Sequence, residues 1–190
     1  MVKTLMTTIG IISDTHIKIG GKRQLPPQVY QAFNNVDLIL HAGDLNTLQV
    51  ISDLEALAPV VAVHGNNDDW DAMQKLETAR RIEIEGCIIG LTHGDQTANG
   101  MAIWPLGDVP GNNHTAAMAL SHFPDADCVV FGHSHWPLID WRDLSGAQGE
   151  LRHVLLFNPG SATKKRRAPE HSCGILRVDG KRLEAELIAW

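Results

Sequence analysis

Cysteine is scarce in this sequence, and its pattern excludes a fold stapled by disulfides. The chain has only three cysteines, Cys87, Cys128 and Cys173, and no two of them form a Cys-x-x-Cys pair. An odd number of isolated thiols among apolar neighbours is typical of buried cysteines in a reducing compartment. The sequence therefore predicts a cytoplasmic protein without a disulfide framework.

An excess of positive charge is also absent. The formal net charge of the 190-residue chain is −6 at pH 7. The protein as a whole therefore lacks the positive field that draws proteins onto nucleic acids or anionic membranes. We expect a small or locally steered ligand, and no stable binding of nucleic acid.

Long hydrophobic runs are missing as well. No stretch approaches the roughly 18 uninterrupted apolar residues that a membrane-spanning helix requires. The apolar run at the N-terminus is interrupted by Thr7 and Thr8 and stopped by Asp14, and it has no small-residue cleavage site. We interpret this run as a first strand, and we expect a soluble protein with no membrane partner.

The chain does contain short β-branched and aliphatic runs of strand length. Its length suits a single domain over residues 1–190. Five runs precede polar residues of interest: Ile9 to Ile12, Val36 to Leu40, Val60 to Val63, Cys87 to Leu91 and Cys128 to Phe131. The other runs are Ile82 to Ile84, Leu155 to Phe157, Ile175 to Val178 and Leu183 to Ile188.

Segments with helical spacing separate the early strands. Gln28 to Phe33 and Thr47 to Leu57 are two of them, with Thr47 as a candidate N-cap, and His114 to Phe123 is a third. Residues 95–113 are rich in Gly, Pro and Asn and predict a long connection, which in compact domains is often functional. The alternation of strands and helices predicts an α/β fold with a largely parallel sheet, and the β-rich second half suggests two packed sheets.

The most informative feature is the residue type that follows each of the five runs. Each run ends in side chains that bind metals: Asp14 and His16, then Asp44, then Asn66, then His93, then His133 and His135. In open α/β sheets, ligands bind beyond the carboxyl ends of the strands. The strand assignment therefore predicts that all seven side chains gather at one place.

Spacing and charge favour two metal ions at this place. Residues i and i+2 of an extended chain point the same way, so Asp14 with His16, and His133 with His135, can each face one point. Seven ligands are too many for one tetrahedral ion, but they suit two ions roughly 3.5 to 4 Å apart with Asp44 as the bridge. Two divalent ions, less two carboxylates and a bridging hydroxide, leave a positive site that can hold a phosphate ester.

Glycines are adjacent in sequence to several of the predicted metal ligands. A site with many side chains in a small space favours glycine at such positions. Gly43, Gly65, Gly94 and Gly132 allow tight turns and a close approach of the backbone that a Cβ would obstruct.

In these residues the chain closely resembles the calcineurin-like metallophosphoesterase superfamily, whose pattern is D-x-H, G-D, G-N-[H/C]-[D/E], H and G-H-x-H in this order. All five blocks are present. "VDLILHAGD" and "FNPGS" are similar to signatures of the small phosphodiesterase branch that also contains the retromer scaffold subunit. The resemblance runs from about Ile9 to the C-terminus, and it implies a four-layer αββα sandwich of two packed mixed sheets flanked by helices.

The resemblance also implies how the ligands divide between the two ions. One ion would be held by Asp14, His16, Asp44 and His135, and the other by Asp44, Asn66, His93 and His133. Imidazole and carboxylate ligands without a thiolate suit Mn, Fe, Zn, Ni or Co better than Ca. The sequence does not choose among these five metals.

The departure from the family pattern is at Asn67. The phosphatases of the superfamily have a His at this place, which pairs with the next acidic residue and assists the leaving group. An amide cannot be a general acid, although its NH2 group can donate a hydrogen bond to a phosphoryl oxygen. Asp68 either orients Asn67 or caps the following helix. The expected catalytic residues are thus Asp44, Asn66, Asn67 and Asp68.

Other polar or aromatic residues are left without a catalytic role. His41, three residues before Asp44, is expected to face away and to have a structural role. Lys164 to Arg167 either steer anionic substrates or form a solvated loop, and we favour the loop. Met101, Trp104 and Trp136 could line a pocket or pack at an interface of a homo-oligomer.

These features predict a metal-dependent phosphodiesterase, in which a metal-bound hydroxide attacks phosphorus in line. Its substrate would be a small phosphate ester. A phosphomonoesterase or protein phosphatase is one alternative, but Asn67 weighs against it because hydrolysis of alkyl or seryl monoesters benefits from the missing acid. A non-catalytic, metal-binding interaction scaffold is the other, and the intact ligand set weighs against that.

Overall fold

The computed structural model describes residues 6–96, 111–145 and 151–190, and two five-stranded sheets form its centre. The first sheet has the order β10-β9-β1-β2-β3. Its strands are β1 (Thr7–Ile12), β2 (Leu38–Ala42), β3 (Val60–Val63), β9 (Ser172–Asp179) and β10 (Arg182–Ala189). Strands β1, β2 and β3 run parallel, whereas β9 is antiparallel to both of its neighbours.

The second sheet has the order β4-β5-β6-β8-β7. Its strands are β4 (Ala79–Ile84), β5 (Cys87–Thr92), β6 (Cys128–Val130), β7 (Leu138–Ser145) and β8 (Leu151–Asn158). Strands β5, β6 and β8 are parallel, and the antiparallel β4 and β7 form the two edges. Both sheets are therefore mixed, and the expected parallel arrangement holds only for β1, β2 and β3 in the first sheet and for β5, β6 and β8 in the second.

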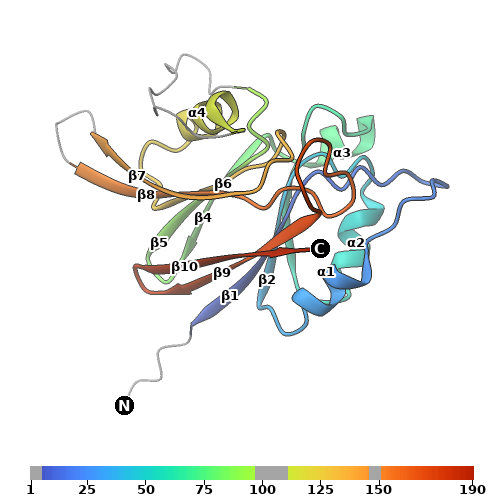
Figure 1. The fold of residues 1–190 in the computed structure, drawn as a ribbon, viewed down its shortest axis with the longest axis horizontal. Coiled ribbons are helices and arrows are strands. Elements are labelled where there is room, and N and C mark those ends of the chain that lie inside the picture. Colours follow the sequence, from blue (N-terminus) through green and yellow to red (C-terminus); the bar gives the residue numbers. More distant parts are fainter. Residues whose placement is uncertain (1–5, 97–110, 146–150) are drawn as a thin grey trace.

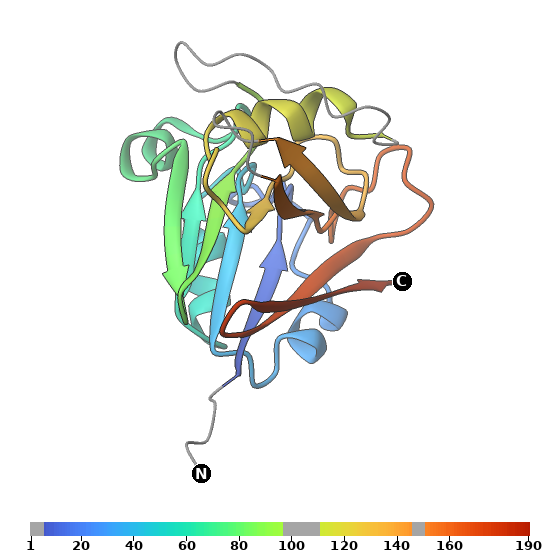
Figure 2. The same ribbon diagram turned by 90° about the vertical axis from the view of Figure 1, so that its left-hand side faces the viewer.

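Helices cover the outer faces of the two sheets. The described part of the chain forms four helices, α1 (Pro27–Ala32), α2 (Gln49–Glu55), α3 (Trp70–Lys75) and α4 (Asn113–Ser121). Helices α1 and α2 lie on the first sheet and α4 lies on the second, as Figures 1 and 2 show. The expected four-layer αββα sandwich is thus confirmed.

Three buried apolar clusters join these four layers. Ile9, Leu40 and Leu155 belong to the cluster between the two sheets. Phe33 belongs to the cluster beneath α1 and α2, and Phe123 to the one beneath α4. The core fixes the positions of the strands and therefore of the loops that follow their carboxyl ends.

Several sequence-based boundaries need correction. Strand β2 spans Leu38–Ala42, so it begins and ends two residues later than expected. His41 therefore lies inside the strand. Helix α2 begins at Gln49, and its N-terminus has no side-chain cap, so the prediction that Thr47 caps it is wrong. The backbone carbonyl of Thr47 accepts a hydrogen bond from Val50 instead.

The expected long connection leads into α4. Residues 97–110, which include Met101 and Trp104, lie outside the described residues, whereas Asn112 is buried just before the helix. Across the described ranges, no helix has both the length and the apolar composition to cross a membrane.

Candidate metal centre

Six of the seven predicted metal ligands lie together beyond the carboxyl ends of their strands. Asp14, His16 and Asp44 come from the first sheet, after β1 and β2. His93, His133 and His135 come from the second sheet, after β5 and β6. The site therefore lies across one edge of the sandwich, where the two sheets face each other. Asp14, Asp44, His93 and His135 are fully buried.

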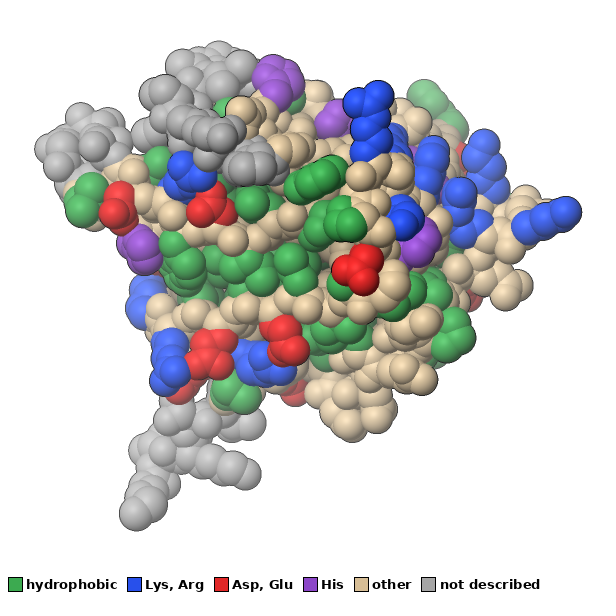
Figure 3. Space-filling model, in the orientation of Figure 1, with side chains coloured by type: hydrophobic (Ala, Val, Ile, Leu, Met, Phe, Trp, Pro, Cys, Tyr) green, Lys and Arg blue, Asp and Glu red, His purple; other side chains and the backbone are tan. Residues whose placement is uncertain are grey.

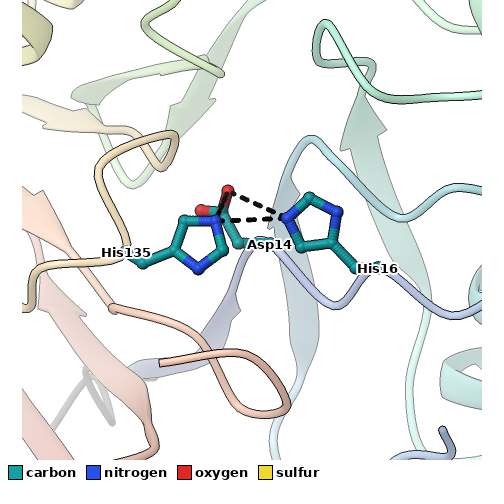
Figure 4. Close-up of side chains that lie close together, drawn as sticks. All are labelled: Asp14, His16 and His135. Carbon is teal, nitrogen blue, oxygen red and sulfur yellow. Dashed lines mark hydrogen bonds and ion pairs between the residues drawn. The ribbon is translucent and has the colours of Figure 1, made fainter. Parts of the chain in front are cut away.

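The first group of donor atoms consists of Asp14, His16 and His135. The Nε2 atom of His135 lies 3.0 Å from Oδ1 of Asp14 and 3.1 Å from Nε2 of His16. Figure 4 shows both rings directed at the Asp14 carboxylate from opposite sides. The three donor atoms thus surround one point.

The second group consists of Asp14, Asp44 and His93. Oδ1 of Asp44 lies 3.4 Å from Nε2 of His93, and Oδ2 lies 3.5 Å from Nε2 of His16. The Nδ1 atom of His133 is 3.3 Å from Nε2 of His93. Each oxygen of the Asp44 carboxylate therefore faces a different histidine.

Left-handed backbone turns bring these side chains together. Asp14, His16, Asp44, His133 and His135 all have positive φ angles, between 47° and 65°. Such angles are uncommon for residues other than glycine and persist where the surrounding structure enforces them. The expectation that extended backbone aligns residues i and i+2 is therefore wrong. Asp14 and His16 do face one point, whereas His133 lies at His93 and His135 lies at Asp14 and His16.

The glycines act as expected from the sequence. A Cβ at Gly65 would lie 2.4 Å from Oδ1 of Asp44, and one at Gly132 would lie 2.6 Å from Oδ2 of Asp14. A Cβ at Gly43 would lie 2.8 Å from Nδ1 of His93. The ligands can approach the backbone this closely only because these positions lack side chains.

Hydrogen bonds to carbonyl oxygens fix the tautomers of two rings. The Nδ1 atom of His93 donates to the carbonyl oxygen of Ala42 over 2.8 Å. The Nδ1 atom of His135 donates to the carbonyl oxygen of Lys164. Because a carbonyl only accepts, the Nε2 atom of each neutral ring carries a lone pair, and it points into the site. Carboxylate oxygens and nitrogen lone pairs thus converge there.

This convergence fits a metal ion. Oδ1 of Asp14 is buried and has no hydrogen-bond partner of good geometry, despite its proximity to His135. Buried polar atoms are normally paired, so an unpaired carboxylate oxygen beside nitrogen lone pairs fits the coordination of a cation. The donor set of imidazole and carboxylate suits a divalent transition metal.

The pKa values of the carboxylates and histidines in the site are set by two opposing effects, which are burial and the charges of neighbouring groups. Burial alone would raise the pKa values of Asp14 and Asp44, but the neighbouring rings of His135 and His93 hold them below the ordinary value. Burial lowers the pKa of His16 to about 4, so this ring is neutral at pH 7. Burial would also lower the pKa of His93, but the two carboxylates raise it to about 9, so without a metal this ring carries a second proton at pH 7, and a metal that binds its Nε2 atom must displace that proton.

The β3–α3 loop carries three of the predicted site residues, and Asn66 and Asn67 differ in their contacts. The side chain of Asn66 is exposed and makes none of the described contacts with the other predicted ligands. Asn67 is also exposed, but its backbone N–H donates to Oδ1 of Asp44 over 2.8 Å and its Nδ2 donates to Oδ2 over 2.7 Å. The predicted role of Asn66 as a metal ligand stays a prediction.

Asp68 has neither of the two roles expected for it. The N-cap of α3 is Asp69, whose side chain accepts from the backbone N–H of Ala72. The buried carboxylate of Asp68 accepts hydrogen bonds from the backbone N–H groups of Asp44, Asn46 and Gly65, at 3.1, 2.6 and 2.7 Å. It therefore ties the loop after β2 to the loop after β3, and positions Asp44.

His41 has the structural place expected of it. The ring is buried in β2, and its Nε2 atom lies 3.1 Å from Oγ1 of Thr15, between the ligands Asp14 and His16. Burial lowers the pKa of His41 to about 3. The neutral ring thus supports the loop that carries two ligands.

The sequence analysis missed several polar side chains that hold the ligand loops. Oδ1 of Asn46 faces Nδ1 of His16 at 3.1 Å. The hydroxyl of Ser161 donates to the carbonyl of Asp14, and Nδ2 of Asn158 donates to the carbonyl of Gly132. Asn158 and Ser161 belong to the "FNPGS" stretch, so the resemblance marked this stretch but did not reveal its role.

Comparisons with known proteins agree with this geometry. Residues 7–181 match the family model of the calcineurin-like phosphoesterase superfamily domain. A probable metallophosphoesterase of Methanothermobacter thermautotrophicus is 37% identical over 95% of this chain and 91% of its own length. A phosphodiesterase of Methanocaldococcus jannaschii is 26% identical over 80% of this chain and 82% of its own length.

Solved structures show the same fold. Vps29 of Entamoeba histolytica, crystallised with zinc, has a TM-score of 0.66 at 23% identity, covering 96% of this chain and 99% of its own. An archaeal phosphodiesterase has a TM-score of 0.63 at 23% identity, covering 96% of this chain and 100% of its own. The fold, the clustered ligands and the family match lead to one conclusion, which is that this chain belongs to the calcineurin-like phosphoesterase superfamily.

Proposed function

We propose that this protein is a metal-dependent phosphodiesterase that works as one catalytic domain over residues 1–190. The observation that carries the proposal is the buried set of carboxylate oxygens and nitrogen lone pairs around Asp14 and Asp44. Divalent metals bound there would lower the pKa of a bound water and offset charge on the phosphoryl oxygens. The phosphodiesterases among its relatives and structural neighbours support this reaction class.

We assign the ligands as the sequence suggested. Asp14, His16, Asp44 and His135 would hold one ion, and Asp44, Asn66, His93 and His133 the other. The Asp44 carboxylate suits the bridging place because its two oxygens face His16 and His93. Mn, Fe, Zn, Ni and Co all fit such donors.

The chain's own residues favour diesters over monoesters. Asn67 occupies the place of the phosphatase histidine, and its amide cannot protonate a leaving group. One hydrogen of its NH2 group is donated to Asp44. The second is available for a phosphoryl oxygen. Esters with good leaving groups need no such proton, whereas alkyl monoesters benefit from it.

A scaffold role without turnover is the alternative that the Vps29 structures raise. What favours catalysis over a scaffold is that the carboxylates and histidines expected for two ions are all present in the chain. The three free, buried cysteines support the proposed cytoplasmic location.

The deciding experiment is hydrolysis of bis-p-nitrophenyl phosphate by protein whose metal content has been measured by elemental analysis. We expect turnover with at least one of the five metals, and loss of roughly a hundredfold or more in kcat for Asp44→Asn. The variant His153→Ala removes an exposed histidine that pairs with Asp143 and serves as the control. Metal-loaded protein without turnover, or an Asp44→Asn variant with full activity, would refute the proposal.

A further inference from the structure

Positive charge is concentrated in two short segments that border the metal centre, although the chain as a whole is acidic. The segments are the β1–α1 loop, with Lys18, Lys22 and Arg23, and the β8–β9 loop, with residues 164–167. Neither the stretch 17–36 nor the stretch 151–169 contains an acidic residue. Figure 3 shows one group of Lys and Arg side chains at the upper right, near histidines, in addition to others at the left that lie beside Asp and Glu.

These basic side chains differ from most of the other described ones, Arg152 excepted, in having no ion pair with a carboxylate. Within residues 6–96, 111–145 and 151–190, carboxylates pair with Lys75, Arg80, Arg81, Arg142, Arg177, Lys181 and Arg182. In the same ranges, no ion pair involves the basic residues of the β1–α1 or β8–β9 loops. Their positive charge is therefore uncompensated and available to an anion.

The β1–α1 loop has a fixed shape that presents its cations. The backbone N–H of Gly21 donates to the carbonyl of Lys18 over 2.9 Å, and Gly20 has a φ of +70°, which closes a tight turn. The guanidinium of Arg23 donates to the carbonyl of His16 over 2.8 Å, so the loop returns to the metal centre. Lys18 and Lys22 thus flank a turn that is anchored at a ligand.

A cavity of about 500 Å³ lies between this loop and the site. It is lined by His16, Lys18, Gly21, Lys22 and Arg23. Its lining contains three cations and no carboxylate, and it shares the candidate ligand His16 with the metal centre. A phosphate group fits such a lining, because ammonium and guanidinium groups form charge-assisted hydrogen bonds with its oxygens.

We propose that this cavity is a subsite for a second phosphate, and that the substrates are diesters that carry a further phosphate group. This inference rests on the proposed phosphodiesterase function. The reacting phosphate would lie at the metal centre, and the additional phosphate would contact Lys18, Lys22 and Arg23. A neutral or singly charged substrate would leave these three cations unused.

The test compares two substrates that differ only in the extra phosphate. They are thymidine 5′-(p-nitrophenyl phosphate) and its 3′-phosphorylated form, which share the base, the reacting phosphorus and the leaving group. We expect kcat/KM to be about tenfold or more higher for the 3′-phosphorylated form at low salt, and this preference to shrink as salt rises. In Lys18→Ala/Lys22→Ala the ratio should fall to about one, while activity on the unphosphorylated form is kept.

Two further double variants test which basic residues cause the preference for the 3′-phosphorylated substrate. Lys75→Ala/Lys181→Ala removes the same charge from exposed, paired positions and should keep the wild-type ratio. Arg166→Ala/Arg167→Ala probes the second basic loop. A ratio near one in wild-type protein, or a preference that is lost only in Arg166→Ala/Arg167→Ala, would overturn the proposed subsite.

A binding measurement separates this inference from the proposed function. If neither substrate is hydrolysed, the phosphodiesterase proposal fails, and calorimetry with metal-loaded protein then decides the subsite. Thymidine 3′,5′-bisphosphate should bind about tenfold more tightly than thymidine 5′-monophosphate, and Lys18→Ala/Lys22→Ala should remove the difference. Equal affinities in the wild-type protein would contradict the subsite.

Discussion

The Nε2 atoms of His16 and His135 lie 3.1 Å apart, and their rings are stacked within 22° of parallel. The ring of His135 has already donated its Nδ1 hydrogen to a carbonyl. Burial keeps His16 neutral by lowering its pKa to about 4. The two rings therefore direct nitrogen lone pairs toward one point beside the Asp14 carboxylate, and a cation relieves this arrangement.

We first expect metal binding to stabilise the fold strongly. A metal at a thousandfold excess over its Kd contributes about 4 kcal/mol to the free energy of unfolding. For a chain of this size, about 2 to 4 °C in Tm corresponds to each kcal/mol. Calorimetry of chelator-treated protein with and without Mn or Zn measures this shift. His135→Ala should lose most of it and His153→Ala should keep it, and equal shifts in both variants would contradict the ligand assignment.

Stability at acid pH should depend on His41. Its pKa is about 3 in the folded protein and about 6.5 in the unfolded chain. Below pH 6.5 the unfolded chain gains a proton that the folded protein does not bind, so the free energy of unfolding falls by up to about 1.4 kcal/mol per pH unit toward pH 3. This contribution is fully present above pH 6.5.

The variant His41→Phe removes this pH-dependent contribution to the free energy of unfolding. It also loses the contact with Thr15. Urea unfolding of both proteins at pH 7, 6 and 5, with chelator present, should give a flatter pH dependence for the variant. The other titrating groups are common to both proteins and cancel in the comparison. Parallel curves would mean that the ring of His41 is not held neutral.

Gly65→Ala should reduce activity without unfolding the protein. Its Cβ would lie 2.4 Å from Oδ1 of Asp44 and 2.6 Å from Cδ2 of His93, so both ligands must move. A displacement of about 1 Å at a catalytic site costs on the order of a hundredfold in rate. Metal-saturated kcat on bis-p-nitrophenyl phosphate is the measurement.

Gly86→Ala is the matched control for this substitution. Gly86 has a φ of +79° and open space around its Cβ position, so alanine there strains only the backbone, at about 1 to 2 kcal/mol. We expect a lower Tm with unchanged kcat. If both alanine variants lose activity equally, the close approach at Gly65 has no specific role.

Asn67→His should shift the preference of the enzyme toward monoesters. A histidine can protonate an alkyl leaving group, and general acids contribute roughly 10² to 10⁴ in rate when well placed. We expect the ratio of monoester to diester kcat/KM to rise by about tenfold or more. Asn67→Ala, which removes the amide without adding an acid, should leave this ratio low. An unchanged ratio in Asn67→His would show that the position does not set the preference.

Much of the fold could be read from the sequence because buried strands and ligand-bearing loops leave local patterns. The run from Cys87 to Leu91 has no polar side chain and was predicted as a strand, and β5 extends it by one residue to Thr92. Leu138–Ser145 forms the edge strand β7, yet it contains Asp140, Arg142 and Asp143, and nothing in its composition separates it from a loop. An edge strand exposes one side to water, so its pattern is weak.

Some features of the metal centre could not be predicted from the sequence, for a different physical reason. Asp14 and His135 were predicted because their residue types show their chemistry. Asp68 was misjudged because its partners are backbone N–H groups, which every residue has. The positive φ of Asp14 also has no local signal, because it is imposed by contacts such as the hydrogen bond from its N–H to Gly43.

The ligands of this centre come from both sheets, and that division has a consequence for assembly. Each of the two donor groups takes side chains from both sheets, since His135 joins Asp14 and His16, and His93 joins Asp14 and Asp44. The centre can therefore form only after the two sheets have docked. A bound metal would cross-link the two sheets through its ligands. One sheet could then slide along the other only after the metal had been released.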